Sequence, residues 1–258
     1  MSSSQTTQNN GQNSVSVSVS GFKQPIVFDN IQNMKAPYTP ENVAVICYDI
    51  LSGYSDISKV RLNQFTLKID CVSESQTLDG LDAAAWVTAA IDFEKSVSEL
   101  RTGNIDAVTM SVKFNGTILS MIHLGHELVH VAQYASKRLR QPITFGKNVS
   151  VKSAFSVGGK LIQKANRNSI PYYDRAWEWE AYGSQQRFAE SIYTTLTGEI
   201  ALELIHKEPS NFMDAMQTLQ QRLSLAHITG FSNFPIQIKN AYGDAKVTGG
   251  KRDFDWGC

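Results

Sequence analysis

Hydrophobic residues alternate with polar ones in some stretches of this chain and recur at helical spacing in others, so both strands and helices are expected. Alternation predicts strands over residues 25–28, 60–71 and 106–114. Helical spacing predicts helices over residues 39–51, 81–100 and 118–136. Thr39 and Pro40 suit the N-cap and the first position of the first helix.

The second half of the chain is predicted to be mainly helical. A Val–Ser alternation over residues 143–161, with the pair Gly158–Gly159, predicts a β-hairpin. A strongly helical segment covers residues 172–196, and further helices are expected over residues 199–207 and 211–227. This order of elements predicts an α+β fold with a small mixed sheet and a helical C-terminal half.

Composition separates the two ends of the chain from its middle. Residues 1–20 are nearly all Ser, Gln, Asn and Thr, so we expect a disordered tail, with an edge strand over residues 15–19 as the alternative. Residues 243–258 are rich in Gly, Lys and Asp and are expected to form a flexible C-terminal tail. Of the 258 residues, 42% are hydrophobic, enough for one domain with a sizeable core over residues 21–242.

Charge and cysteine content exclude several classes of protein. The net charge is zero, which argues against a general nucleic-acid binder. Without a basic start followed by an apolar core, or an apolar run of about twenty residues, we expect a soluble protein that binds no membrane. It would be cytoplasmic, or released without a recognisable signal peptide. Cys47, Cys71 and Cys258 lack metal-ligand spacing, which favours a reducing compartment.

The positive charge is unevenly distributed along the chain. Residues 131–173 contain Lys and Arg at eight positions, within residues 137–167, and no Asp or Glu. One interpretation is a solvated surface balanced by the acidic segment at residues 41–106. The other is an electropositive wall beside a cleft, which would attract an acidic substrate or partner.

The motif with the clearest chemistry is His126-Glu127-Leu128-Val129-His130, within the predicted helix 118–136. Helical spacing places both imidazoles on one face, where they can bind one Zn²⁺ ion while Glu127 lies beside a metal-bound water. The neighbouring helical positions are uncharged, as expected for a helix buried behind a metal site. We therefore predict His126 and His130 as zinc ligands and Glu127 as the general base.

A catalytic zinc ion needs a third protein ligand, and the candidates lie in the segment 172–182. Glu178 and Glu180 are two residues apart, so they cannot both face the metal from one helix. We favour Glu178, whose face also carries Ala181, where a small side chain lets two helices approach. Glu180 remains the alternative, and Asp174 is a weaker one because it suits a helix N-cap.

The motif and the downstream segment resemble the gluzincin branch of zincin-like zinc metallopeptidases, in which a Glu from a later helix completes the site. The pattern H-E-L-x-H-x-x-Q over residues 126–133, followed by E-x-E-A from Glu178, is also similar to a family of small bacterial zinc peptidases. A metzincin would need Gly and His where this chain has Gln133 and Ser136. Tyr182 stands where gluzincins usually carry Asp, so the resemblance does not identify the side chain that hydrogen-bonds the zinc-binding imidazole here.

Several other residues are candidates for hydrogen-bond partners of the zinc-binding histidines or for donors to the transition state. Tyr182, Tyr173 and His123 are the main ones, and His123 lies on the same helical face as His126. Tyr172, Arg175, His206 and His227 are further candidates as donors. A strand over residues 108–113 would bind an extended peptide if it formed the sheet edge over the cleft, whereas an internal strand could not.

These features predict a zincin-like α+β domain that acts as a zinc-dependent endopeptidase on peptide or protein substrates. The alternative is a noncatalytic interaction or structural protein that zinc stabilises. A toxin-type effector on a zincin scaffold is a further alternative, since long polar tails would suit delivery. The intact Glu127 favours the enzyme, because a structural zinc site needs no base.

Overall fold

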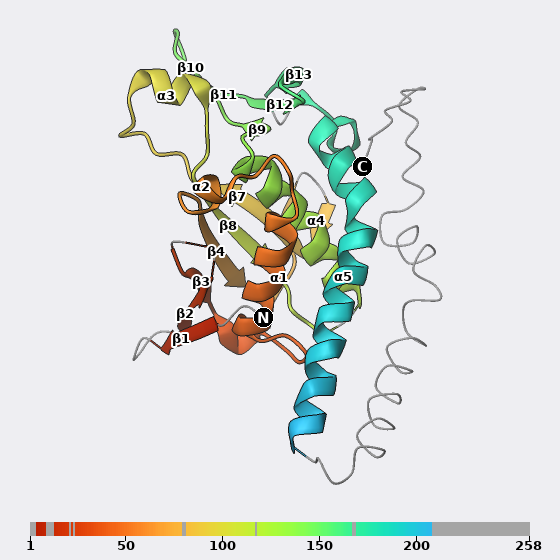
Figure 1. The fold of residues 1–258 in the computed structure, drawn as a ribbon. Coiled ribbons are helices and arrows are strands. Elements are labelled where there is room, and N and C mark those ends of the chain that lie inside the picture. The colour runs from red at the N-terminus through yellow and green to blue at the C-terminus, as the bar shows by residue number, and fades with distance from the viewer. Residues whose placement is uncertain are drawn as a thin grey trace.

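The computed structural model describes residues 4–8, 13–20, 22, 24–78, 81–116, 118–166 and 169–207 (Figure 1). The expected helix over residues 211–227 and the expected tail over residues 243–258 lie outside the described residues. Within them the fold is a mixture of helices and strands built around a small mixed sheet.

A six-stranded sheet has the order β1-β2-β3-β4-β8-β7. Its strands are β1 (Ser4–Gln8), β2 (Ser14–Val19), β3 (Ile26–Asp29), β4 (Thr66–Cys71), β7 (Ala85–Ala89) and β8 (Ala107–Val112). The central strands β3, β4 and β8 are parallel, and the outer strands pair antiparallel to their neighbours. Parallel neighbours require crossover connections, and the helical segments supply them.

The alternation of side chains gives the sheet one apolar face. In β4, Leu67, Ile69 and Cys71 are buried, whereas Lys68 between them is exposed and pairs with Asp29 of β3. The sheet therefore buries one side and leaves the other polar.

The helices of the described chain vary widely in length. They are η1 (Ile31–Asn33), α1 (Pro40–Ser52), α2 (Lys59–Leu62), α3 (Val97–Thr102), α4 (Ile118–Ala135), η3 (Tyr172–Asp174) and α5 (Ala176–Lys207). Figure 1 shows α1 and α4 against the sheet and α5 running along α4, and α1, α4 and α5 all contact one another. None of these helices is both long and apolar enough to cross a bilayer.

The expected start of α1 is confirmed in detail. Thr39 accepts a hydrogen bond from the backbone N–H of Asn42, while the side chain of Asn42 accepts one from the N–H of Thr39. Pro40 occupies the first turn, where its missing N–H has no helical partner. This reciprocal cap stabilises the helix that crosses from β3 to β4.

Short strands complete the chain between α4 and α5. They form the pair β10 (Ile143–Thr144) and β11 (Ser150–Val151), and a sheet of β9 (Leu139–Arg140), β12 (Ser153–Val157) and β13 (Lys160–Ala165). The expected hairpin is confirmed as β12 and β13, which turn at Gly158 and Gly159. Both glycines have positive φ, a backbone conformation that is unfavourable for residues with a Cβ.

The helix expected over residues 81–100 is wrong. The segment forms β6 (Leu81–Ala83), which pairs with β5 (Gln76–Leu78), then β7, and only then α3. β7 gains a full antiparallel ladder with β8, and this non-local pairing outweighs the helix propensity of the alanines. The strand expected over residues 60–71 is confirmed only from Thr66, because α2 takes the preceding residues.

The disordered tail expected over residues 1–20 is wrong for Ser14–Val19. Val15, Val17 and Val19 of β2 are buried in the main core, and β2 also packs against α1. Strict alternation places all three valines on the apolar face of the sheet, which offsets the entropy of ordering a polar segment. β1 pairs with β2 on its outer side, so β2 is internal rather than the edge strand of the alternative expectation.

Arg61 connects the end of α4 to the start of β8. Its Nε donates to the carbonyl of Ala135 at 2.7 Å, and its two terminal nitrogens bond to Asp106 and to the carbonyl of Ile105. The carbonyls at the end of a helix have no helical partner, so a buried guanidinium is an effective cap there. Arg61 thereby fixes the position of α4 relative to the sheet.

We expect Arg61→Met to lower the free energy of unfolding by about 3 kcal/mol, because it leaves buried acceptors without a donor. Lys68→Met is the matched control, since it breaks an exposed ion pair and should cost less than about 1 kcal/mol. Urea unfolding of the two variants tests this expectation. Equal losses in both variants would contradict the role of Arg61.

Candidate metal centre

The polar residues of the motif at 126–130 lie on helix α4 and are buried in the core. His126, Glu127 and His130 are 3%, 6% and 8% exposed, and the apolar residues between and after them are fully buried. Burying two imidazoles and a carboxylate is unfavourable unless each finds a partner. The site therefore depends on what α5 brings against this face.

A glycine allows α5 to approach α4 at the motif. A Cβ on Gly125 would lie 3.1 Å from both the carbonyl oxygen of Gln185 and the Cβ of Phe188. Ala181, one turn before Gln185, is fully buried and is also small. These small residues bring the two helices close enough for the first turn of α5 to reach the two histidines.

Glu178, in that first turn, completes a buried group with His126 and His130. Its Oε2 lies 3.1 Å from His130 Nε2 and 3.4 Å from His126 Nε2, and the two Nε2 atoms are 3.2 Å apart. A tetrahedral Zn²⁺ with bonds of about 2.0–2.1 Å separates its ligand atoms by about 3.3–3.4 Å. The three atoms therefore have the spacing and the chemistry of a zinc ligand set, and the group could hold a metal ion.

Without a cation, Glu178 stabilises a proton on His130. Burial lowers the pKa of His130, but the charge and hydrogen bond of Glu178, together with Glu127 and Gln133, raise it to about 9. Burial raises the pKa of Glu178, but the charge of His130 and hydrogen bonds from both histidines hold it well below its usual value. Metal binding at neutral pH must displace the proton from His130.

Two glutamine side chains contact the outer nitrogens of the histidines. His126 Nδ1 lies 3.1 Å from Gln185 Oε1, and His130 Nδ1 lies 3.0 Å from Gln133 Oε1. Both glutamines are buried. Such contacts orient metal-binding imidazoles, a role for which Tyr182, Tyr173 and His123 were candidates.

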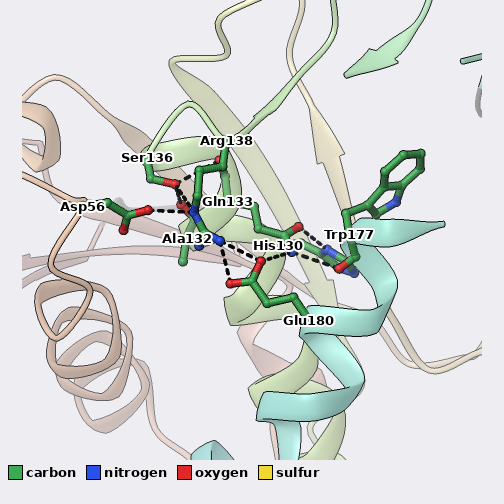
Figure 2. A network of polar contacts seen from close by, with 8 residues as sticks. All are labelled: Asp56, His130, Ala132, Gln133, Ser136, Arg138, Trp177 and Glu180. Atoms are coloured by element: carbon green, nitrogen blue, oxygen red, sulfur yellow. Dashed lines mark hydrogen bonds and ion pairs between the residues drawn. The ribbon is translucent and has the colours of Figure 1, made fainter. Parts of the chain in front are cut away.

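Glu180 lies outside the ligand group, in a polar network around Gln133 (Figure 2). Its carboxylate accepts from Gln133 Nε2 at 2.9 Å, and both of its oxygens lie 2.7 Å from Arg138 Nη1. Arg138 also pairs with Asp56 at 2.7 Å. Glu178 and Glu180 thus have different roles, because two residues along a helix turn their side chains to different sides.

Two tyrosines lie next to the ligand group. The ring of Tyr182 packs edge-on against His126, with centroids 4.8 Å apart, and Tyr172 packs edge-on against Tyr182 at 6.3 Å. Burial and the negative charges of Glu178 and Glu127 raise the pKa of Tyr172, so its phenol stays protonated at neutral pH. The phenol of Tyr172 is also hydrogen-bonded to Tyr182. Sequence reasoning did not rank Tyr172 above the other candidate donors.

The remaining candidates lie outside the ligand group. His123 is neutral at pH 7, because burial and the nearby His126 lower its pKa to about 4. Asp174 is exposed, and Arg175 is buried over the ring of Tyr172. The backbone of Tyr173 belongs to η3, but its side chain is not among those described. His206 likewise has only its helical backbone described, and His227 lies outside the described residues.

Among the residues that sequence reasoning missed, Gln133 and Gln185 had a detectable signal. Gln133 lies one turn after His130, and Gln185 lies two turns after Glu178 on the same face. A glutamine within an apolar helical face must be hydrogen-bonded when it is buried. The histidine tautomer that Gln133 imposes, however, depends on Trp177 and Glu180, which belong to α5.

Comparison with models of known protein families, with curated proteins and with solved structures gives no match for this chain.

In the metal-free protein we expect an NMR titration to give His130 a pKa of about 9. In Glu178→Gln, the value should fall by about two units or more, because burial then acts without its main opposing charge. His123 is an internal control that should stay neutral from pH 6 to 9 in both proteins. Titration of His130 near 6.5 in both would show that the imidazole and Glu178 are not paired.

Proposed function

We propose that this chain is a zinc-dependent peptidase with a zincin-like fold of the gluzincin type, acting on peptide or protein substrates. The observation that supports it is the convergence of His126 Nε2, His130 Nε2 and Glu178 Oε2 within 3.1–3.4 Å of one another. Two imidazoles and one carboxylate leave the fourth tetrahedral position of a zinc ion open, as catalytic sites require.

Bound zinc would lower the pKa of a coordinated water and polarise the scissile carbonyl. Glu127 lies next to a ligand on α4, and its charge is felt at His130. Its carboxylate would accept the proton of the attacking water and then donate it to the leaving amine.

Tyr172 is the donor that we assign to the developing oxyanion. Its phenol remains protonated and feels the charges of Glu178 and Glu127. The phenol is also hydrogen-bonded to Tyr182, so it would have to turn its proton toward the oxyanion. A fixed donor in a buried site stabilises negative charge more strongly than water does. Tyr182 would hold the Tyr172 ring in place while packing against His126.

An extended substrate could pair with the edge of the sheet at β7, and not at the strand over residues 108–113 that the sequence suggested. β8 is internal, and β7 is the last strand of the sheet and contacts α4. Lys113 N donates to Ala84 O and Ala90 N donates to Ala107 O, so even-numbered residues of β7 face β8. Val87 therefore directs its N–H and C=O away from β8, to a side where no other strand of the described residues pairs. A peptide could add there as a further strand.

We expect the protein to bind one zinc ion per chain and to cleave an unfolded polypeptide. Glu127→Gln should keep the zinc and lose activity by about 10²–10⁴-fold, because the general base is removed while the ligands remain. Glu99→Gln, an exposed change on α3, is the matched control and should retain activity. Zinc bound without cleavage of any tested polypeptide would favour the noncatalytic alternative.

We expect Val87→Pro to raise KM for an unfolded polypeptide about five- to tenfold, with kcat and zinc content little changed. The substitution removes one N–H from the free side of β7, the position at which an edge strand tolerates proline. Thr88→Pro should instead lower stability by about 3 kcal/mol, because the N–H of Thr88 belongs to the ladder with Thr109. An unchanged KM in Val87→Pro would exclude substrate pairing at this edge.

A further inference from the structure

The amide of Gln133 has one orientation that satisfies its surroundings. Its Nε2 lies 2.9 Å from the carbonyl of Trp177 and 2.9 Å from Glu180 Oε2. Both groups accept hydrogen bonds, so the NH₂ end of the amide must face them. The oxygen is then directed at His130 Nδ1, 3.0 Å away (Figure 2).

This orientation determines which nitrogen of His130 carries the proton. An amide oxygen only accepts, so Nδ1 must be the N–H and the lone pair lies on Nε2. Nε2 is the atom that faces His126 and Glu178. A flipped amide would present its NH₂ to Nδ1 and favour the proton on Nε2, where it opposes a metal ion.

We propose that Glu180 is a positioning residue for the metal centre: by accepting from Gln133 while Arg138 holds its carboxylate, it keeps the His130 lone pair aimed at the metal. This inference rests on the proposed zinc site. It assigns Glu180 a role distinct from that of Glu178, although both belong to the first turns of α5.

Arg138 makes the carboxylate of Glu180 necessary. A guanidinium only donates, and its Nη1 lies 2.7 Å from both oxygens of Glu180. If residue 180 were Gln, its single oxygen would turn to Arg138 and its NH₂ would face the NH₂ of Gln133. Gln133 could relieve that clash only by flipping against the Trp177 carbonyl.

The test compares zinc affinity in four proteins by competition with a chelator. Glu180→Gln has the same shape as the native side chain and should weaken zinc binding about tenfold. Asp56→Asn is the matched control: it makes the same charge change on the outer side of Arg138, without touching Gln133, and should stay within about twofold.

A double variant separates positioning from general stability. Gln133→Glu combined with Glu180→Gln exchanges the amide and the carboxylate. Residue 133 can then only accept from His130 Nδ1, and residue 180 can donate to it while accepting from Arg138. Zinc affinity should return to at least the wild-type value, although the Trp177 carbonyl then faces a carboxylate and thermal stability should not recover.

The Nδ1 protons of the ligands supply a second readout. In the Co²⁺-substituted wild-type protein, NMR in H₂O should show two shifted exchangeable imidazole signals that vanish in D₂O. The His130 signal should be lost or exchange faster in Glu180→Gln, while that of His126, held by Gln185, persists as the internal control.

The outcomes distinguish this inference from the proposed function. Tenfold weaker binding in Glu180→Gln, with recovery in the double variant, supports the positioning role. Wild-type zinc affinity and an unchanged His130 signal in Glu180→Gln would overturn it, as would a double variant as weak as the single one. Absence of zinc binding by the wild type would overturn the metal centre itself.

Discussion

The candidate metal centre depends on the close approach of three electron-pair donors that are buried between α4 and α5. The two Nε2 atoms of His126 and His130 lie 3.2 Å apart, and Glu178 approaches both. Such a group repels itself unless a proton or a cation lies among its members. A proton serves in the metal-free protein, and the spacing suits a zinc ion equally well.

The two helices can create this site because the surrounding elements constrain them. α4 lies against the sheet, and Arg61 fixes its end through the carbonyl of Ala135. Gly125 of α4 and Ala181 of α5 are small, so the two helices can approach each other closely. Packing energy from the apolar core thus compensates for polar groups that would be unstable if the helices were free to separate.

Polar side chains continue outward from the histidines toward solvent, and charged groups follow the neutral amides. Amide groups contact the histidines, the carboxylate of Glu180 contacts one of these amides, and Arg138 and Asp56 complete the chain toward solvent. Each contact along this path joins a donor to an acceptor, although Arg138 Nη2 is buried without a hydrogen-bond partner among the described residues. The ion pair between Arg138 and Asp56 also links the basic segment 137–167 to the acidic segment 41–106.

The sequence by itself determined the features that depend on local spacing. His126 and His130 share a face because they are four residues apart, the Thr39 cap starts α1, and Gly158–Gly159 turns a hairpin. Only the tertiary structure decided which groups these elements meet. Pairing with β8 made residues 85–89 a strand, and burial in the core ordered the valines of β2. The packing of α5 against α4 placed Glu178 beside the histidines and Glu180 beside Gln133. Helical and strand periods are encoded over a few residues, whereas pairing and burial depend on segments tens of residues away, so no local pattern can specify them.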